Sequence, residues 1–298
     1  MAQPKSKNHG GIKFKNVLKT LYGLFLPEQG DSRGYAVCRV LISVLLAVSL
    51  LITAAFAVFF AEESRQRRIA SQLRGIMYNE ELSESERTAA LKKLNGDYAY
   101  WIKSETANID LPVYKSDGRF YKNHNADGHY SRYGSLYTQT DSKKCRVVYG
   151  NALKNGDMLG GLKNFRRVKS YQKSPLIEIF EGDNSRPYVV FSVMLIDSGE
   201  KNGFEYARDG FENFADFSQW LAEIRDRSIL DTGTVAKYGD NLLFLVADTD
   251  DFRGAKLVVA AYEIRGDENI SSTENASENS DVRYPDKWYK VHGVEKPQ

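Results

Sequence analysis

An uninterrupted apolar segment near the N-terminus constrains this chain more than any other feature. Residues 40–61, VLISVLLAVSLLITAAFAVFFA, span 22 positions without a charged side chain. A helix of this length extends about 33 Å at 1.5 Å per residue, which is enough to cross the hydrocarbon core of a bilayer. A secretory signal peptide has a shorter apolar region and a small-residue cleavage site, which residues 54–57, AAFA, match poorly. We therefore predict an uncleaved transmembrane helix.

The charge on each side of this segment predicts its orientation. Residues 1–39 form a basic segment with seven lysines and arginines against two acids. Such an excess normally stays on the cytoplasmic side of the membrane. Arginines at 65, 67 and 68 weaken the asymmetry, and the two glutamates before them partly offset this effect. We therefore predict a single-pass protein of the cell membrane, with a cytoplasmic N-terminus and an extracellular C-terminal domain.

Residues 12–26 of the basic segment, IKFKNVLKTLYGLFL, place apolar side chains at helical spacing beside lysines. A helix that lies on an anionic membrane surface has this pattern. A basic flank that only fixes the topology explains the pattern equally well.

A helical stalk is predicted at residues 62–96, directly after the apolar segment. Its second helix begins with a capping box formed by Ser83 and Glu86, and we expect it to end at Gly96. The stalk would therefore link the membrane helix to whatever domain follows.

Residues 97–265 change to short apolar runs separated by turn residues, which indicate a mainly-β barrel or sandwich. One helix is expected to interrupt the strands at residues 211–228, with an aromatic face in the core. That face comprises Phe211, Phe214, Phe217, Trp220, Leu221 and Ile224. Residues 266–298 begin with an acidic stretch rich in Ser, Asn and Glu, which we predict to be a disordered tail.

Several classes of function lack sequence support. The net charge of +2 gives no reason to expect nucleic acid, and no Gly-rich phosphate loop, paired-cysteine zinc site or His-Glu metal helix is present. The acids at 248, 250 and 251 fit no calcium loop. Cys145 is the single cysteine beyond the apolar segment, so it is either a nucleophile or a small strand residue. His124 is expected to be structural, and we predict no metal or cofactor.

The sequence NLLFLVADTDDFRGAKLVVAAYEI, residues 241–264, predicts a β-hairpin whose first strand ends at Asp248 and whose second begins near Lys256. These two side chains would face one another across the mouth of the hairpin and form an ion pair. If the pair is solvated, it contributes under about 1 kcal/mol.

Five stretches of the extracellular region share one resemblance. They are LKKLNGDYAYWIKSETANIDLPVY, FYKNHNADGHYSRYGSLY, VVYGNALKNGDMLGGLKNF, YVVFSVMLID and LAEIRDRS, and the hairpin above completes the set. In order and spacing they resemble the class B sortases, membrane-anchored cysteine transpeptidases of Gram-positive bacteria, over about residues 90–264. The resemblance implies a closed sortase β-barrel with N-terminal helices and one helix inserted before the last two strands.

The resemblance also locates three catalytic positions, and each is changed here. The family has a histidine after a Tyr-Gly pair, a cysteine at the end of the penultimate strand and an arginine at the start of the last strand. The matching residues are Asn151, Asp248 and Lys256. A carboxylate attacks an amide poorly, an asparagine has no titratable proton near neutral pH, and a lysine lacks the planar fork of arginine. We therefore predict a pseudoenzyme at the cell surface.

Such a protein would act as a binding or accessory module in surface-protein or pilus assembly. Its partners would be a sorting-signal peptide, a surface or pilin protein, or an active sortase. Two alternatives remain open. Asp248 would carry altered chemistry in the first, and in the second a dry pocket would allow an isopeptide bond between Lys256 and Asn151. As a buried ion pair, Asp248 and Lys256 would add little net stability, but removal of one partner would cost about 3–5 kcal/mol.

Overall fold

The computed structural model describes residues 30, 32–182, 184–200, 203–266 and 268–296. They belong to two compact units, residues 1–65 and 66–298. Most of the basic segment, including residues 12–26, lies outside the described residues, so its two interpretations stay open.

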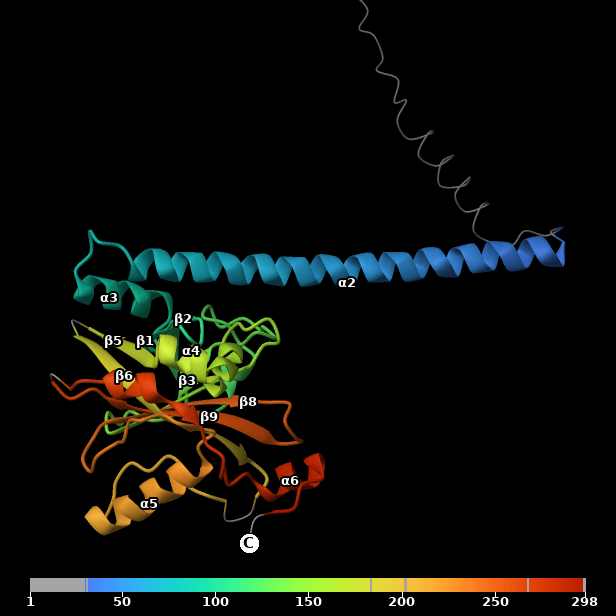
Figure 1. Ribbon diagram of the computed structural model, residues 1–298. Helices are drawn as coiled ribbons and strands as arrows, with labels where there is room; N and C mark the ends of the chain where they lie inside the picture. The colour runs from blue at the N-terminus through green and yellow to red at the C-terminus, as the bar shows by residue number, and fades with distance from the viewer. Residues whose placement is uncertain (1–29, 31, 183, 201–202, 267, 297–298) are drawn as a thin grey trace, which may run out of the picture. The chain divides into compact units, whose positions relative to one another are not determined.

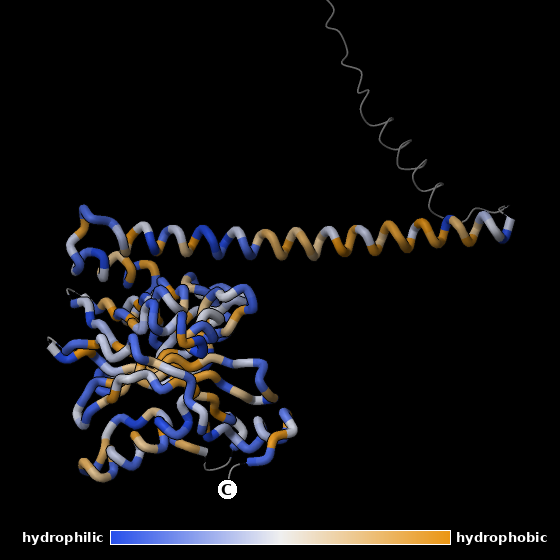
Figure 2. The backbone as a smooth tube through the Cα atoms, in the orientation of Figure 1, coloured by the Kyte–Doolittle hydropathy of each residue, from blue (hydrophilic) through white to orange (hydrophobic). Residues whose placement is uncertain are grey.

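Helix α2 (Arg33–Met77) contains the whole predicted membrane segment. Of the helices in the described ranges, it is long and apolar enough to cross a membrane, and its most apolar window is not buried by protein. Figure 2 shows this stretch as a nearly continuous hydrophobic part of the helix, followed by a hydrophilic part. The hydrophilic part continues without a break into the first half of the predicted stalk, because no proline intervenes.

Eight described strands form the closed β-barrel of the second unit (Figure 1). Around the barrel their order is β1-β2-β3-β4-β8-β9-β6-β5. Two neighbouring pairs, β2–β3 and β4–β8, are parallel, and the others are antiparallel. The strands are β1 (Tyr98–Ser104), β2 (Ile109–Lys115), β3 (Leu136–Thr138), β4 (Cys145–Gly150), β5 (Leu176–Glu181), β6 (Asn184–Asp197), β8 (Leu242–Asp248) and β9 (Ala255–Glu263). The closed barrel with helical additions confirms the predicted fold class.

Helices precede the first strand, lie in connections between strands and follow the last strand. They are α3 (Glu84–Leu94), α4 (Val168–Lys173), α5 (Phe214–Arg227), α6 (Asp286–His292) and the 3₁₀ helices η1 (Phe120–Lys122), η2 (Gly160–Arg166) and η3 (Ser271–Asn275). The predicted capping box of α3 is present, but the helix ends at Leu94 with Asn95 as its cap, so Gly96 does not end it. Helix α5 is the predicted inserted helix, although Phe214 is exposed at its first turn, where no strand covers it.

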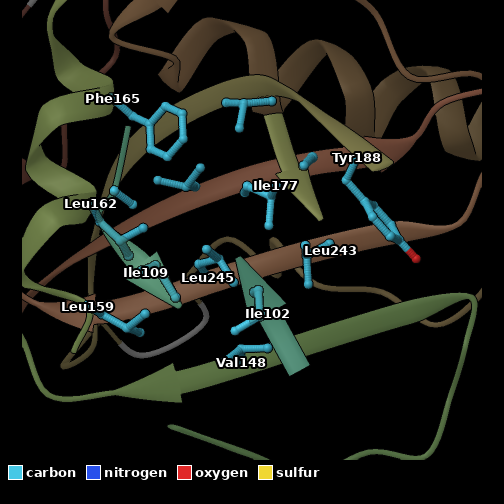
Figure 3. Close-up of a cluster of buried hydrophobic side chains, with 14 of the residues drawn as sticks. Ile102, Ile109, Val148, Leu159, Leu162, Phe165, Ile177, Tyr188, Leu243 and Leu245 are labelled. Atoms are coloured by element: carbon cyan, nitrogen blue, oxygen red, sulfur yellow. The ribbon is translucent and has the colours of Figure 1, made fainter. Parts of the chain in front are cut away.

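Strand β8 is apolar on both faces because its successive side chains point alternately into two apolar clusters. Leu243 and Leu245 point into the barrel, whereas Phe244 and Val246 belong to a second cluster outside it, with Trp220 of α5. Figure 3 shows the interior cluster, in which the hydroxyl of Tyr188 points away from the aliphatic side chains. A strand covered on both sides reads as a continuous hydrophobic run.

The predicted disorder of residues 266–298 was wrong for the part that the structure describes. There the chain forms η3, pairs β10 (Ser277–Glu278) with β7 (Leu230–Asp231), and forms α6. Trp288 packs against the barrel core, and Lys287 lies 2.8 Å from a carboxylate oxygen of Asp197. This polar segment becomes ordered because the barrel provides an apolar surface and hydrogen-bond partners for it.

Candidate functional site

The three positions singled out in the sequence meet at one end of the barrel. Strand β4 ends at Gly150 beside Ala247 of the parallel strand β8, so the next residues along each chain, Asn151 and Asp248, lie at adjacent strand tips. The antiparallel register of β8 and β9 pairs Asp248 with Lys256. All three line a pocket of about 30 Å³, enough for about two water molecules. The pocket is completed by Lys122, Tyr137, Tyr149, Gly150 and Val246.

Two lysines hold the Asp248 carboxylate. Lys256 Nζ donates to Oδ1 at 2.6 Å, and Lys122 Nζ lies 3.4 Å from Oδ2. Burial opposes ionisation of Asp248, but the hydrogen bond and charge of Lys256, followed by those of Lys122, hold its pKa below the ordinary value. The carboxylate is therefore an anion near neutral pH, matched by more than one positive charge.

The predicted ion pair exists, but it is not buried. The side chains of Asp248 and Lys256 are 57% and 29% exposed. An isopeptide bond between Lys256 and Asn151 would require a dry pocket, whereas this strand tip is solvated. We therefore expect this ion pair to contribute under about 1 kcal/mol to stability, the value for a solvated pair.

Asn151 binds backbone rather than the charged pair. Its amide nitrogen donates to the carbonyl oxygens of Lys122 at 2.7 Å and Tyr133 at 3.2 Å, with Arg132 more distant at 3.4 Å. Gly134 adopts φ +65° at this point, and a Cβ atom there would lie 2.5 Å from the Lys122 oxygen. Asn151 therefore fastens the connection between β2 and β3 to the tip of β4.

A larger groove of about 460 Å³ lies on another side of Asp248. Its apolar lining includes Leu153, Leu159 and Leu257, and its polar rim includes Lys154, Lys163, Asp248 and Asp250. An extended peptide needs such a combination of apolar contact and polar groups. The sequence alone did not reveal this groove, because its walls come from η2, the loop before it and the β8–β9 loop.

Asp251, in the loop after β8, is engaged by protein groups. Arg166 donates to both carboxylate oxygens of Asp251, at 2.9 and 3.0 Å, and thereby joins η2 to the β8–β9 loop. Across the described ranges, no group of three His, Cys, Asp or Glu side chains is arranged to hold a metal ion.

The remaining candidate side chains lie outside the pocket. Cys145 begins β4, opposite Leu242, at the far end of the strand from Asn151. Burial raises the pKa of its thiol to about 12, so a thiolate is strongly disfavoured. His124 bonds the carbonyl of Phe120 at 2.8 Å and stacks on its ring, in agreement with the predicted structural role.

Comparisons with known proteins give a consistent result. No family model matches the chain. Sortase B of Staphylococcus aureus (strain NCTC 8325 / PS 47) is 23% identical over 184 residues, covering 59% of this chain and 74% of that protein. Among solved structures, Clostridium perfringens sortase B is 27% identical with a TM-score of 0.55, covering 60% of this chain and 100% of that chain. A Staphylococcus aureus sortase B–substrate complex is 21% identical with a TM-score of 0.60, covering 69% and 97%.

Proposed function

We propose that this chain, a sortase-type protein similar to class B sortases, is a membrane-anchored binding module without cysteine transpeptidase activity. One observation carries the proposal. The pocket where the resemblance places a histidine, a cysteine and an arginine is formed here by Asn151, Asp248 and Lys256. The anchor would be α2, with the barrel on the outer face of the cell membrane.

The chemistry of this pocket opposes acyl transfer. Capture of an acyl group needs a nucleophile that is later a good leaving group, and a thiolate meets both needs. The Asp248 carboxylate is instead neutralised by Lys256 and Lys122. Asn151 has no proton to exchange near neutral pH, and its amide is already bonded to backbone oxygens. The pocket is thus a polar contact surface.

Binding does not require the lost nucleophile, because a groove and a reacting group are separable. The groove beside Asp248 supports a peptide ligand by its volume and its apolar lining. The solved Staphylococcus aureus sortase B–substrate complex shows that a protein of this fold holds a substrate. We infer that this chain binds a sorting-signal peptide, a surface or pilin protein, or an active sortase, and assists assembly at the cell surface.

Restoration of the three positions tests this proposal. We expect the variant N151H/D248C/K256R to form a covalent acyl adduct with a sorting-signal peptide, visible by intact mass, while the parent forms none. The matched control N151H/D248S/K256R retains every change except the thiol and should also form none. A covalent adduct on the parent would refute the proposed inactivity, and an inert triple variant that still folds would argue against a retained peptide groove.

The alternatives are tested separately. If Asp248 carries altered chemistry, D248A abolishes whatever hydrolysis the parent shows. An isopeptide bond between Lys256 and Asn151 releases ammonia, so intact mass detects it directly. The ion pair of Lys256 with Asp248 and the backbone bonds of Asn151 leave both groups engaged elsewhere.

A further inference from the structure

An aromatic cluster protrudes from the connection between β2 and β3. It consists of Phe120, His124 and Tyr130. Phe120 and Tyr130 are 46% and 69% exposed. The His124 ring stacks on Phe120 at 3.9 Å between centroids and meets Tyr130 edge-on at 6.2 Å. His124 is partly buried between them, but Phe120 and Tyr130 remain exposed, so core packing alone does not explain these two rings.

Positively charged side chains flank this cluster in the sequence. Arg119, Lys122 and Arg132 are exposed on the same connection. The acid nearest in sequence to Tyr130 is Asp127, whose carboxylate lies 3.0 Å from His129. Aromatic rings mixed with lysine and arginine are the composition found at the boundary between lipid headgroups and acyl chains.

The stalk part of α2 holds this connection firmly. Gln66 donates a hydrogen bond to the hydroxyl of Ser131, which is fully buried and lies between Tyr130 and Arg132 in the sequence. Leu73 and Met77 then pack in one cluster with Tyr121, the residue after Phe120. The aromatic cluster is therefore attached to the first residues of the second unit.

The length of chain between the membrane segment and this attachment is short. Gln66 is the fifth residue after Ala61, where the apolar segment ends. Even a fully extended chain of five residues spans at most about 18 Å. Whatever the path of the chain, a membrane helix at 40–61 keeps Ser131 and its neighbours within reach of the lipid surface.

We propose that the aromatic cluster is a membrane-contact surface that binds the phospholipid bilayer in which the same chain is anchored. This inference rests on the proposed anchoring by α2. Lys122 belongs both to this connection and to the pocket around Asp248. Membrane contact would therefore place the pocket beside the lipid surface, where a ligand that is itself held by the membrane reaches it.

Spin labels measure the contact in the full-length protein. The protein is reconstituted in nanodiscs of phosphatidylcholine and phosphatidylglycerol, with Cys38→Ser and either Tyr130→Cys or Tyr238→Cys as the labelled position. Tyr238 is a matched control because it is also an exposed tyrosine but contacts Phe214 and Phe217 around α5. Cys145 is buried, and burial raises its pKa to about 12, so the label reacts at the introduced thiol.

We expect a paramagnetic chelate on the lipid headgroups to relax the label at 130 several-fold more strongly than the label at 238. Equal relaxation would overturn the membrane-contact surface while leaving the anchor intact. Failure of the chain to enter nanodiscs would contradict anchoring by α2, and the proposed membrane contact would be refuted with it.

Hydrogen exchange in nanodiscs provides a second readout. We expect Phe120→Ser combined with Tyr130→Ser to increase exchange at residues 119–134 several-fold in nanodiscs and to change it little in detergent. The control Phe214→Ser removes an exposed phenylalanine from α5 and should leave residues 119–134 unchanged in both. An increase of equal size in detergent would mean that the rings act within the fold, and this result would also overturn the proposal.

Discussion

Two ion pairs at opposite ends of β4 have nearly the same distance between their charged groups but very different exposure to solvent. Lys256 and Asp248 lie 2.6 Å apart beyond the end of the strand, and Arg146 and Glu181 lie 2.7 Å apart near its start. The Arg146 and Glu181 side chains are only 6% and 28% exposed, about half or less of the values at the other pair. The distance between the charged groups therefore does not predict how much each pair contributes to stability. Solvent screens the Lys256–Asp248 pair much more than the Arg146–Glu181 pair.

The buried pair belongs to a polar network inside the barrel. The Arg146 guanidinium lies 4.9 Å from the ring of Tyr100. Burial opposes its charge, but Glu181 and the nearby hydroxyls of Tyr100 and Tyr188 hold its pKa above the ordinary value. Among the described residues, Arg146 Nε and both hydroxyls lack a hydrogen-bond partner of good geometry. Loss of Arg146 would leave the partly buried Glu181 carboxylate without its nearest compensating charge.

This difference in exposure explains why side chains at the strand tips can be replaced while the fold persists. Side chains at the tips of β4, β8 and β9 contact solvent, so their replacement removes little burial energy. Side chains near the start of β4 are enclosed by the barrel, and their replacement disturbs the core.

Replacement of Arg146 should have the largest effect. Arg146→Met keeps much of the side-chain volume but leaves Glu181 with only the more distant Lys143, at 3.7 Å, and two tyrosine hydroxyls without their charged neighbour. We expect the free energy of unfolding to fall by about 3–5 kcal/mol, measured by urea denaturation. A loss under about 1 kcal/mol would mean that this end of the barrel is as solvated as the other.

A double variant sharpens this result. Arg146→Met combined with Glu181→Leu removes both charges, so no carboxylate remains at this site. We expect the double variant to be more stable than Arg146→Met alone. Equal stability of the two would show that packing around the guanidinium, rather than the unpaired charge, accounts for the loss.

Asp251 should give an intermediate effect, because its bond to Arg166 lies at the site end but is partly buried. Burial opposes ionisation of Asp251, whereas hydrogen bonds from Arg166 and Thr249 hold its pKa below the ordinary value. Asp251→Asn keeps the shape and removes the charge, and we expect it to cost about 1.5–3 kcal/mol. Hydrogen exchange of the β8–β9 loop should increase in the same variant. An unchanged loop would contradict a role for this pair in holding the groove wall.

The barrel and its hairpin were predictable because their signals are local. Continuous apolar runs define β8 and β9, and a short turn between them fixes Asp248 opposite Lys256. The capping box of α3 and the buried face of α5 likewise depend on residues three or four positions apart. Patterns of this kind need no knowledge of the rest of the chain.

Other features depend on contacts between distant segments, and the sequence did not reveal them. Lys122 approaches Asp248 from 126 positions away, so nothing near either residue indicates the second ion pair. The order of residues 268–296 depends on the barrel surface, which local composition does not describe. Exposure of the Asp248 pair is likewise a property of the assembled strand tips, and the sequence predicts the pairing but not the solvent around it.

Replacement of Asp248 should have the smallest effect on stability, and its pH dependence identifies the cause. The folded pKa of Asp248 lies below its ordinary value of 3.8. The pair therefore stabilises the fold above about pH 4, and this contribution is lost as the pH falls through the lower folded pKa. We expect Asp248→Asn to reduce the free energy of unfolding by less than about 1 kcal/mol at pH 7. The difference from the parent should shrink toward pH 3, and also in 1 M salt, where the Debye length is about 3 Å. A loss equal to that of Arg146→Met and insensitive to salt would show that water does not screen this pair, and the contrast between the two barrel ends would fail.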